Sequence, residues 1–286
     1  MGVRACILTG FGINCDYETA HAFRMAGAEA VRVHINDLID GHDSLKEYQI
    51  LAFPGGFSFG DDIASGKVFA VKCTHTLRAQ LDEFIAAKKL IIGICNGFQS
   101  LVKMRILPRT TEGDDQEGDG IPGAAQGNRN ADGLLGAAPG IQQATLTFND
   151  SGRFEDRWVN LRVNPKSPCV WTRGLEDLYV PVRHGEGKFV PADETARKTL
   201  IASNQVVVQY ATESGEPTAD YPLNPNGSVD AIAGVCDPSG RIFGLMPHPE
   251  CHIFPTQHPR WTRQPLPDEA PGLALFRNAV EHAAAR

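Results

Sequence analysis

Short apolar runs alternate with amphipathic stretches through the first hundred residues. Four runs rich in β-branched and other apolar side chains predict strands, at residues 5–8, 31–34, 49–53 and 90–94. Three stretches with helical spacing accompany them, at residues 16–25, 74–87 and 97–104. Strands that alternate with helices favour a mostly parallel sheet with helices on both faces. This part of the chain therefore predicts an α/β fold.

The pattern changes in the middle of the chain. Gly, Asp, Ala and Asn dominate residues 111–140, so we predict a mobile insertion there. The chain beyond it predicts extra, more antiparallel strands, at residues 144–148, 158–163, 206–210, 231–235 and 242–246. Residues 255–271 are proline-rich and predict a loop-like extension before a last amphipathic helix. No internal repeat is visible, so we expect a single domain across residues 1–286.

Composition narrows the class of protein. The chain has 286 residues, of which 42% are hydrophobic and 21% charged, as in ordinary globular proteins. A formal net charge of −7 gives no basic field for nucleic acid, and no stretch is long and apolar enough to predict a membrane span. The seven cysteines are odd in number and show no disulfide or CxxC spacing. We therefore expect a reduced, cytoplasmic setting.

The stretch Gly93-Ile94-Cys95-Asn96-Gly97 joins an apolar strand to a helix. It matches the nucleophile elbow G-x-S-x-G with sulfur in place of oxygen. Glycines relieve the crowding of such a turn, and a thiol at a helix N-terminus is favoured as the thiolate. Most free cysteines are small buried hydrophobes, however, and the pentapeptide alone does not decide between the two interpretations.

A base for this thiol is offered by Met246-Pro247-His248-Pro249-Glu250. In an extended segment His248 and Glu250 project to the same face, so the carboxylate could orient the imidazole toward Cys95. The prolines predict a stiff segment that does not become helical. A lone histidine after a strand is more often structural, and only its combination with the elbow favours catalysis.

Amide hydrolysis also needs donors for a tetrahedral oxyanion. The elbow supplies the amide of Asn96, and Gly55 and Gly56, which follow a predicted strand, could bring a second amide to the site. Alone, Pro54-Gly55-Gly56 would simply be a turn. A role for these glycines in catalysis is favoured only in combination with the Cys95 elbow.

Six segments now suggest a family. They occur in the order GINCD (12–16), PGGFSFGD (54–61), GICNGFQ (93–99), HGEGKF (184–189), NPNGS (224–228) and GLMPHPE (244–250). The chain resembles the class I glutamine amidotransferases, and within them the glutaminase components of the phosphoribosylformylglycinamidine synthases. GxCxGxQ marks the wider class, whereas HGEG followed by NPNGS and MPHPE is specific to these synthases. The resemblance spans residues 12–250.

The resemblance implies roles for nine residues. It implies Cys95 as nucleophile, His248 as general base and acid, and Glu250 as the residue that orients it. It implies an oxyanion site at Gly55, Gly56 and Asn96, and glutamine-binding contacts from Gln99, His184 and Gly185.

The resemblance also implies a fold, a reaction and partners. The fold would be flavodoxin-like, and L-glutamine would be hydrolysed through a cysteinyl thioester. The ammonia would pass to an ATP- and Mg-using synthetase subunit, often with a small third subunit, which aminates formylglycinamide ribonucleotide in purine biosynthesis. The chain has no GxxxxGK[ST], so we expect no cofactor of its own.

Three features depart from the family pattern: Cys251 after Glu250 where a basic residue is usual, the 111–140 insertion and the 255–271 extension. SGRFEDRW (151–158) resembles the large fused form of the enzyme. The three departures affect the contacts expected with the partner subunit rather than the Cys95 site.

Two alternatives stay open. A stand-alone cysteine hydrolase would also carry an elbow, although the paired His248 and Glu250 argue against it. A structural metal cluster could use His248, Cys251, His252 and His258, but adjacent ligands have poor geometry for one tetrahedral ion. We therefore expect no metal centre.

Overall fold

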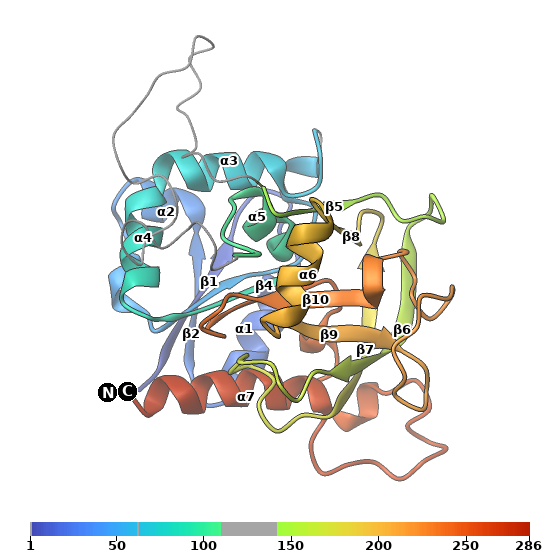
Figure 1. Ribbon diagram of the computed structural model, residues 1–286. Coiled ribbons are helices and arrows are strands. Elements are labelled where there is room, and N and C mark those ends of the chain that lie inside the picture. The colour runs from blue at the N-terminus through green and yellow to red at the C-terminus, as the bar shows by residue number, and fades with distance from the viewer. Residues whose placement is uncertain (1, 62, 110–141) are drawn as a thin grey trace.

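The computed structural model describes residues 2–61, 63–109 and 142–286, and a nine-stranded sheet runs through it (Figure 1). Five neighbouring strands are parallel, in the order β2-β1-β3-β4-β11. Their bounds are β1 Arg4–Thr9, β2 Glu29–His34, β3 Ile50–Phe53, β4 Leu90–Ile94 and β11 Ile242–Leu245. This is the doubly wound flavodoxin-like order, so the predicted fold class is confirmed.

An antiparallel extension continues from β11 in the order β10-β9-β6-β7. These strands are β10 Ile232–Cys236, β9 Val206–Ala211, β6 Glu155–Val163 and β7 Asp177–His184. A separate antiparallel pair is formed by β5 Ala144–Thr147 and β8 Lys188–Pro191. The extra antiparallel strands expected from the sequence are therefore present.

Helices cover both faces of the parallel half (Figure 1). On one side α1 (Asp16–Met25) packs against α7 (Pro271–Ala284), and on the other α3 (Lys67–Thr76) packs against α5 (Asn96–Lys103). Every residue of β3 and β4 is buried, as expected for strands covered on both faces. The remaining helices are α2 Ile35–Ile39, α4 Arg78–Ala86 and α6 Glu194–Ala202.

The predicted single helix at 74–87 is wrong. The chain is already helical from Lys67 and breaks at Leu77, whose φ of −112° lies outside the helical range. Leu77 is only 1% exposed, so its burial in the core fixes the break where the sequence carries no glycine or proline. α4 then starts at Arg78 as a separate helix.

Strand β7 was not predicted because Pro181 interrupts its apolar pattern. A proline lacks the amide proton that a central strand needs. β7 lies at the end of the strand order, where no further strand needs an amide proton from Pro181. The missed strand matters because it ends at His184.

The sequence predicted two segments without regular strands or helices. The 111–140 insertion falls outside the described residues. Residues 255–271 are mostly loop, with one 3-10 turn at Pro255–Gln257 before α7 starts. Within the described part of the chain, no helix has the length and apolar character that a membrane crossing requires.

Candidate active site

Cys95 lies between β4 and α5 in a strained turn. Its φ of 50° and ψ of −108° are unusual for a residue with a side chain. A Cβ on Gly97 would lie 1.8 Å from the carbonyl oxygen of Phe53, and one on Gly93 would lie 2.6 Å from Leu101. Both glycines are therefore required by close packing, and the predicted elbow is present.

His248 lies beside the elbow because β11 pairs with β4. The register matches Ile94 with Leu245, and the Cys95 amide donates to the Leu245 carbonyl at 2.8 Å. The chain then continues to His248, whose own amide donates to the Pro181 carbonyl of β7 at 2.8 Å. The position of the imidazole is thus set by backbone bonds to neighbouring strands.

Glu250 Oε1 accepts a hydrogen bond from Nδ1 of His248 at 2.6 Å, and both side chains are buried. The segment is not extended as expected, because Pro249–Cys251 forms a 3-10 turn. The fixed φ of Pro249 suits the first position of such a turn. The pair meets across this turn, with the His248 ring held by a carboxylate.

The charge of Glu250 decides the protonation of His248. Burial acts to lower the pKa of His248, but the negative charge of Glu250, together with the neighbouring sulfur atoms of Cys95 and Cys15, outweighs it. The pKa of His248 therefore lies well above its usual value. Nε2 is buried and has no hydrogen-bond partner within the described residues. Glu250 therefore orients the ring through Nδ1, and Nε2 is left available for proton transfer.

Gly55 lies directly over this group. A Cβ on Gly55 would approach Cε1 of His248 to 2.8 Å and Cβ of Cys95 to 3.4 Å. The Gly55 carbonyl accepts from the amides of Asn14 and Cys15, at 3.4 and 3.2 Å. The structure therefore brings the predicted glycine loop to the Cys95 site and holds it there through residues 12–15.

Asn96 and Gln99 connect the elbow to the loops around it. Asn96 Oδ1 accepts from the Ser58 amide at 3.2 Å, and its Nδ2 donates to Asp61 and to Gln99 Oε1, each at 3.1 Å. Gln99 Nε2 donates to the Glu186 carbonyl at 2.6 Å. The Gln99 amide is thus engaged by the protein itself and positions the 184–187 loop.

His184 is buried near His248 but held differently. Asn149 Nδ2 donates to the His184 carbonyl at 2.8 Å, so its Oδ1 faces the ring and accepts from Nδ1 at 3.2 Å. Burial, together with the positive charge of His248, lowers the pKa of His184 to about 3. His184 is therefore neutral, and its Nε2 is buried without a partner among the described residues.

Sequence reasoning assigned no role to Asn149 or Cys15. Asn149 also accepts from the Gly187 amide at 3.0 Å and so holds both ends of the HGEG loop. Asn226 of NPNGS donates to the Gly187 carbonyl at 2.8 Å. The NPNGS motif could have indicated from the sequence that Asn226 supports the HGEG loop. For Asn149 the sequence offered no such motif, only a position after a predicted strand.

Cys251, which departs from the family pattern, has a cationic neighbour. Arg183 Nη1 donates to its Sγ at 3.4 Å. The positive charge expected after Glu250 is thus supplied from β7.

The alternative metal cluster is not assembled in the described residues. His252 Nδ1 donates to the Tyr179 carbonyl at 2.7 Å, and the His258 ring packs against the rings of Trp158 and Tyr179. Within this part of the chain, the potential ligand atoms that do lie close together belong to Cys15, His248 and Glu250.

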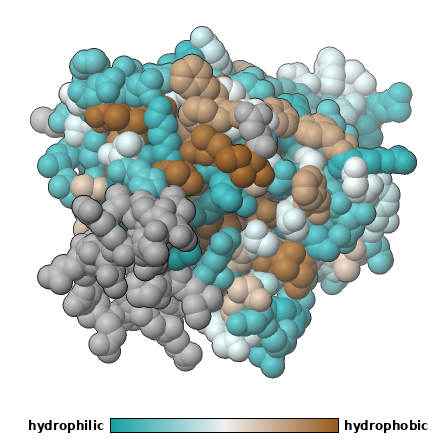
Figure 2. All heavy atoms as spheres, turned by 90° about the horizontal axis from the view of Figure 1, so that it is seen from above, coloured by the Kyte–Doolittle hydropathy of each residue, from teal (hydrophilic) through white to brown (hydrophobic). Residues whose placement is uncertain are grey.

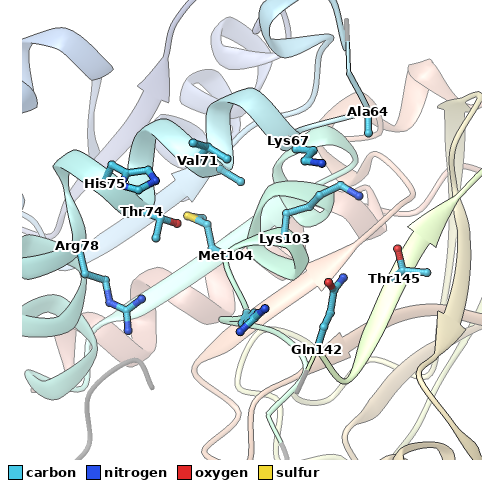
Figure 3. A pocket seen from close by; sticks show the side chains of 12 residues that line it. Ala64, Lys67, Val71, Thr74, His75, Arg78, Lys103, Met104, Gln142 and Thr145 are labelled. Atoms are coloured by element: carbon cyan, nitrogen blue, oxygen red, sulfur yellow. The ribbon is translucent and has the colours of Figure 1, made fainter. Parts of the chain in front are cut away.

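A hollow of about 360 Å³ lies between α3, α5 and β5 (Figure 3). Its lining includes Lys67, His75 and Lys103, and the side chains of the two lysines point toward the same space. Burial lowers the pKa of Lys103, and the positive charge of Lys67 adds to this effect although Glu186 opposes it. The hollow does not include Cys95, so it is separate from the site described above.

Comparison with known proteins agrees with this geometry. Residues 2–283 match the model of the CobB/CobQ-like glutamine amidotransferase domain. The phosphoribosylformylglycinamidine synthase subunit PurQ of Dehalococcoides mccartyi is 44% identical over 98% of both chains. This chain belongs to the PurQ family of glutamine amidotransferases. Family membership makes it an enzyme and confirms the resemblance drawn from the six sequence segments.

Two further comparisons concern a long single-chain protein and a chain from a solved structure. The phosphoribosylformylglycinamidine synthase of Homo sapiens is 35% identical over 96% of this chain, which matches 20% of that longer protein. The structure of PurLQS from Thermotoga maritima contains a chain with a TM-score of 0.65 and 28% identity, with 99% of both chains covered. The fold is therefore found both in separate subunits and within a large single chain.

Proposed function

We propose that the protein hydrolyses L-glutamine to glutamate and ammonia through a γ-glutamyl thioester on Cys95. One observation carries the proposal: the strained Cys95 elbow lies beside a buried imidazole whose Nδ1 is held by Glu250 at 2.6 Å. Nε2 of the same ring has no hydrogen-bond partner among the described residues. A nucleophile and an oriented base in this arrangement are suited to acyl transfer.

The reaction proceeds in two acyl-transfer steps. Cys95 Sγ attacks the γ-carboxamide carbon, and His248 delivers a proton to the departing ammonia. A water molecule, deprotonated by His248, then hydrolyses the thioester and releases glutamate. The raised pKa of His248 supports a proton donor in the first step. Amides of Gly55, Gly56 and Asn96 stabilise the oxyanion in both steps.

The loop around His184 forms the glutamine-binding wall. His184 is neutral and presents an unpartnered Nε2 acceptor, and Gly185 leaves the adjoining backbone accessible. Gln99 acts indirectly, because its amide already binds the Glu186 carbonyl. We therefore assign Gln99 the role of positioning this wall.

The ammonia is used by a synthetase partner. The similarity to PurQ subunits and to a chain of the PurLQS structure supports a phosphoribosylformylglycinamidine synthase complex. The partner, with ATP and Mg, converts formylglycinamide ribonucleotide to formylglycinamidine ribonucleotide in purine biosynthesis, and a small third subunit completes the complex. This chain uses no cofactor of its own, and the complex works in the cytoplasm.

Exposed apolar side chains support docking of a partner close to the site. Phe57 and Phe154 are 46% and 53% exposed, and their rings lie 6.1 Å apart. Phe57 directly follows the Gly55-Gly56 loop. Apolar residues also gather on the upper face of the molecule (Figure 2). Exposed apolar groups of this kind mark protein contacts.

The test is the Cys95→Ala variant in complex with the synthetase subunit. Glutamine-dependent amination should be abolished, while amination from added ammonia should continue at the wild-type rate. Glutaminase activity of the wild-type chain should also rise when the partner is added. Loss of both activities in Cys95→Ala, or a wild-type glutaminase rate unaffected by the partner, would contradict the proposal.

A further inference from the structure

The thiol of Cys15 lies beside the candidate base, His248, and the proposed reaction assigns this thiol no role. It precedes α1, and its amide donates to the Gly55 carbonyl at 3.2 Å. A point at the position of a Cβ on Gly55 lies 3.3 Å from Cys15 Sγ and 2.8 Å from Cε1 of His248. The thiol, the imidazole and the Gly55 loop therefore meet at one place.

The groups around Cys15 have the character of metal ligands. One ligand atom from each of Cys15, His248 and Glu250 lies within 4.8 Å of the others. Nε2 of His248 and Oε2 of Glu250 are buried and have no hydrogen-bond partner within the described residues. Two polar atoms left unpaired in a buried cluster are costly unless something binds them.

The pairing of His248 with Glu250 is also the arrangement that prepares a histidine for a metal. A carboxylate that accepts from one ring nitrogen fixes the tautomer and directs the lone pair of the other nitrogen outward. Here Glu250 accepts from Nδ1 at 2.6 Å, so Nε2 is the nitrogen whose lone pair a metal can take once its own proton has left. The hydrogen bond that orients His248 as a general base would therefore also orient it as a metal ligand.

We propose that Cys15 and His248 form a binding site for a thiophilic divalent cation, with Zn²⁺ as the representative ion. Thiolate sulfur and imidazole nitrogen are preferred ligands of Zn²⁺. On binding, the Cys15 thiol and the protonated His248 ring each lose a proton to solvent as the metal bonds to Sγ and to Nε2. Cys95 is a further neighbour of this imidazole but lies outside the close group, and its Sγ donates to the Arg183 carbonyl at 3.5 Å, so it is not assigned to the site.

Occupation of this site inhibits the enzyme, and this consequence rests on the proposed function. A cation on Nε2 occupies the lone pair that would accept a proton, and it also screens Cys95 from glutamine. Removal of the ion restores both groups. Metal binding itself depends only on Cys15 and His248 and can be measured without glutamine.

The first experiment measures binding to the purified full chain. Co²⁺ should bind at one equivalent and give the ultraviolet absorption band of a cobalt–thiolate bond, and Zn²⁺ should displace it. Cys15→Ser should weaken Zn²⁺ binding at least tenfold in competition with a chromophoric chelator. Cys251→Ser is the matched control, because that thiol is close by but binds Arg183, and it should bind Zn²⁺ as the wild type does.

The result that overturns the site is a Cys15→Ser or Cys15→Ala variant that binds Zn²⁺ within twofold of the wild type. A control variant that loses as much affinity as Cys15→Ser overturns it as well. Binding with the expected dependence on Cys15, in a chain without glutaminase activity in its complex, would uphold the site and contradict the proposed function.

The second experiment measures inhibition of the complex. For each variant, glutaminase activity with Zn²⁺ is divided by its own activity without metal. The concentration for half inhibition should rise at least tenfold in Cys15→Ser relative to wild type and Cys251→Ser, and a chelator should restore activity. Equal sensitivity of all three proteins would contradict the role of Cys15.

Discussion

Two buried histidines are each held by their Nδ1, one by a carboxylate and the other by an amide. In the loop after β11, Glu250 binds His248. At the end of β7, Asn149 binds His184. Burial disfavours the charged form of both rings, and at His248 the carboxylate of Glu250 is the largest of the effects that offset it. The pKa of His248 is raised and that of His184 is lowered to about 3.

This difference shows how neighbouring imidazoles take different roles. The fold buries both to 2% exposure, so burial alone cannot distinguish them. The charge of the hydrogen-bond partner distinguishes the two rings, and the positive charge on His248 lowers the pKa of His184 further. One ring can then exchange protons while the other stays a neutral acceptor.

The largest effect is expected from Glu250→Gln, which removes the charge but keeps an oxygen that can accept from Nδ1. Without the carboxylate, burial should dominate and the pKa of His248 should fall. Glutaminase activity of the complex should drop by about 10²- to 10⁴-fold, the usual contribution of a general acid–base. Glutamate release measures the rate, and NMR titration measures the pKa.

The control for this variant is Glu216→Gln, which changes an exposed carboxylate in a turn. It should leave the glutaminase rate unchanged. A Glu250→Gln rate within threefold of wild type would mean that the charge of Glu250 is not needed.

A smaller effect is expected from Asn149→Asp, which gives His184 a carboxylate. The pKa of His184 should rise above about 3. The change also removes the two donors to the carbonyls of His184 and Arg153, at 2.8 and 2.9 Å. Loss of these buried bonds should lower the free energy of unfolding by about 2–4 kcal/mol. Urea denaturation and NMR titration measure the two effects, and an unchanged His184 pKa would contradict the comparison.

The smallest effect is the pH dependence of stability that His184 contributes. Its folded pKa of about 3 lies below the ordinary unfolded value of about 6.5. Between these values the unfolded chain binds more protons, so the contribution is complete above pH about 6.5 and is lost as the pH falls toward about 3.

The variant His184→Asn tests this sign. Its deficit in unfolding free energy relative to wild type should shrink by about 1–2 kcal/mol between pH 6.5 and 5. Urea denaturation at the two values gives the difference. A deficit that grows as the pH falls would show that His184 is charged in the folded protein.

The sequence predicted those features that depend on neighbouring residues. The elbow is local, because a buried strand, two glycines and a helix follow one another around Cys95. The pairing of His248 with Glu250 is also local, although the sequence did not show the 3-10 turn between them. The parallel half of the sheet followed from its alternating strands and helices.

The sequence could not predict contacts that form only after distant loops fold together. Cys15 reaches the site because the Gly55 carbonyl binds its loop, and Asn149 binds His184 across a sequence separation of 35 residues. β7 was missed because Pro181 is acceptable only at a sheet edge, which local pattern does not reveal. The break at Leu77 is likewise set by tertiary burial.

The pairing of β4 with β11 has a consequence for synthesis of the chain. β4 carries the thiol, but the strand that delivers its base is the last one in the sequence and lies between β4 and β10. On the ribosome, the Cys95 turn is made before β5 to β10 are synthesised, and His248 emerges only after them. A chain released before that point would carry the thiol without its base, so incomplete copies could not release ammonia in the absence of their partner.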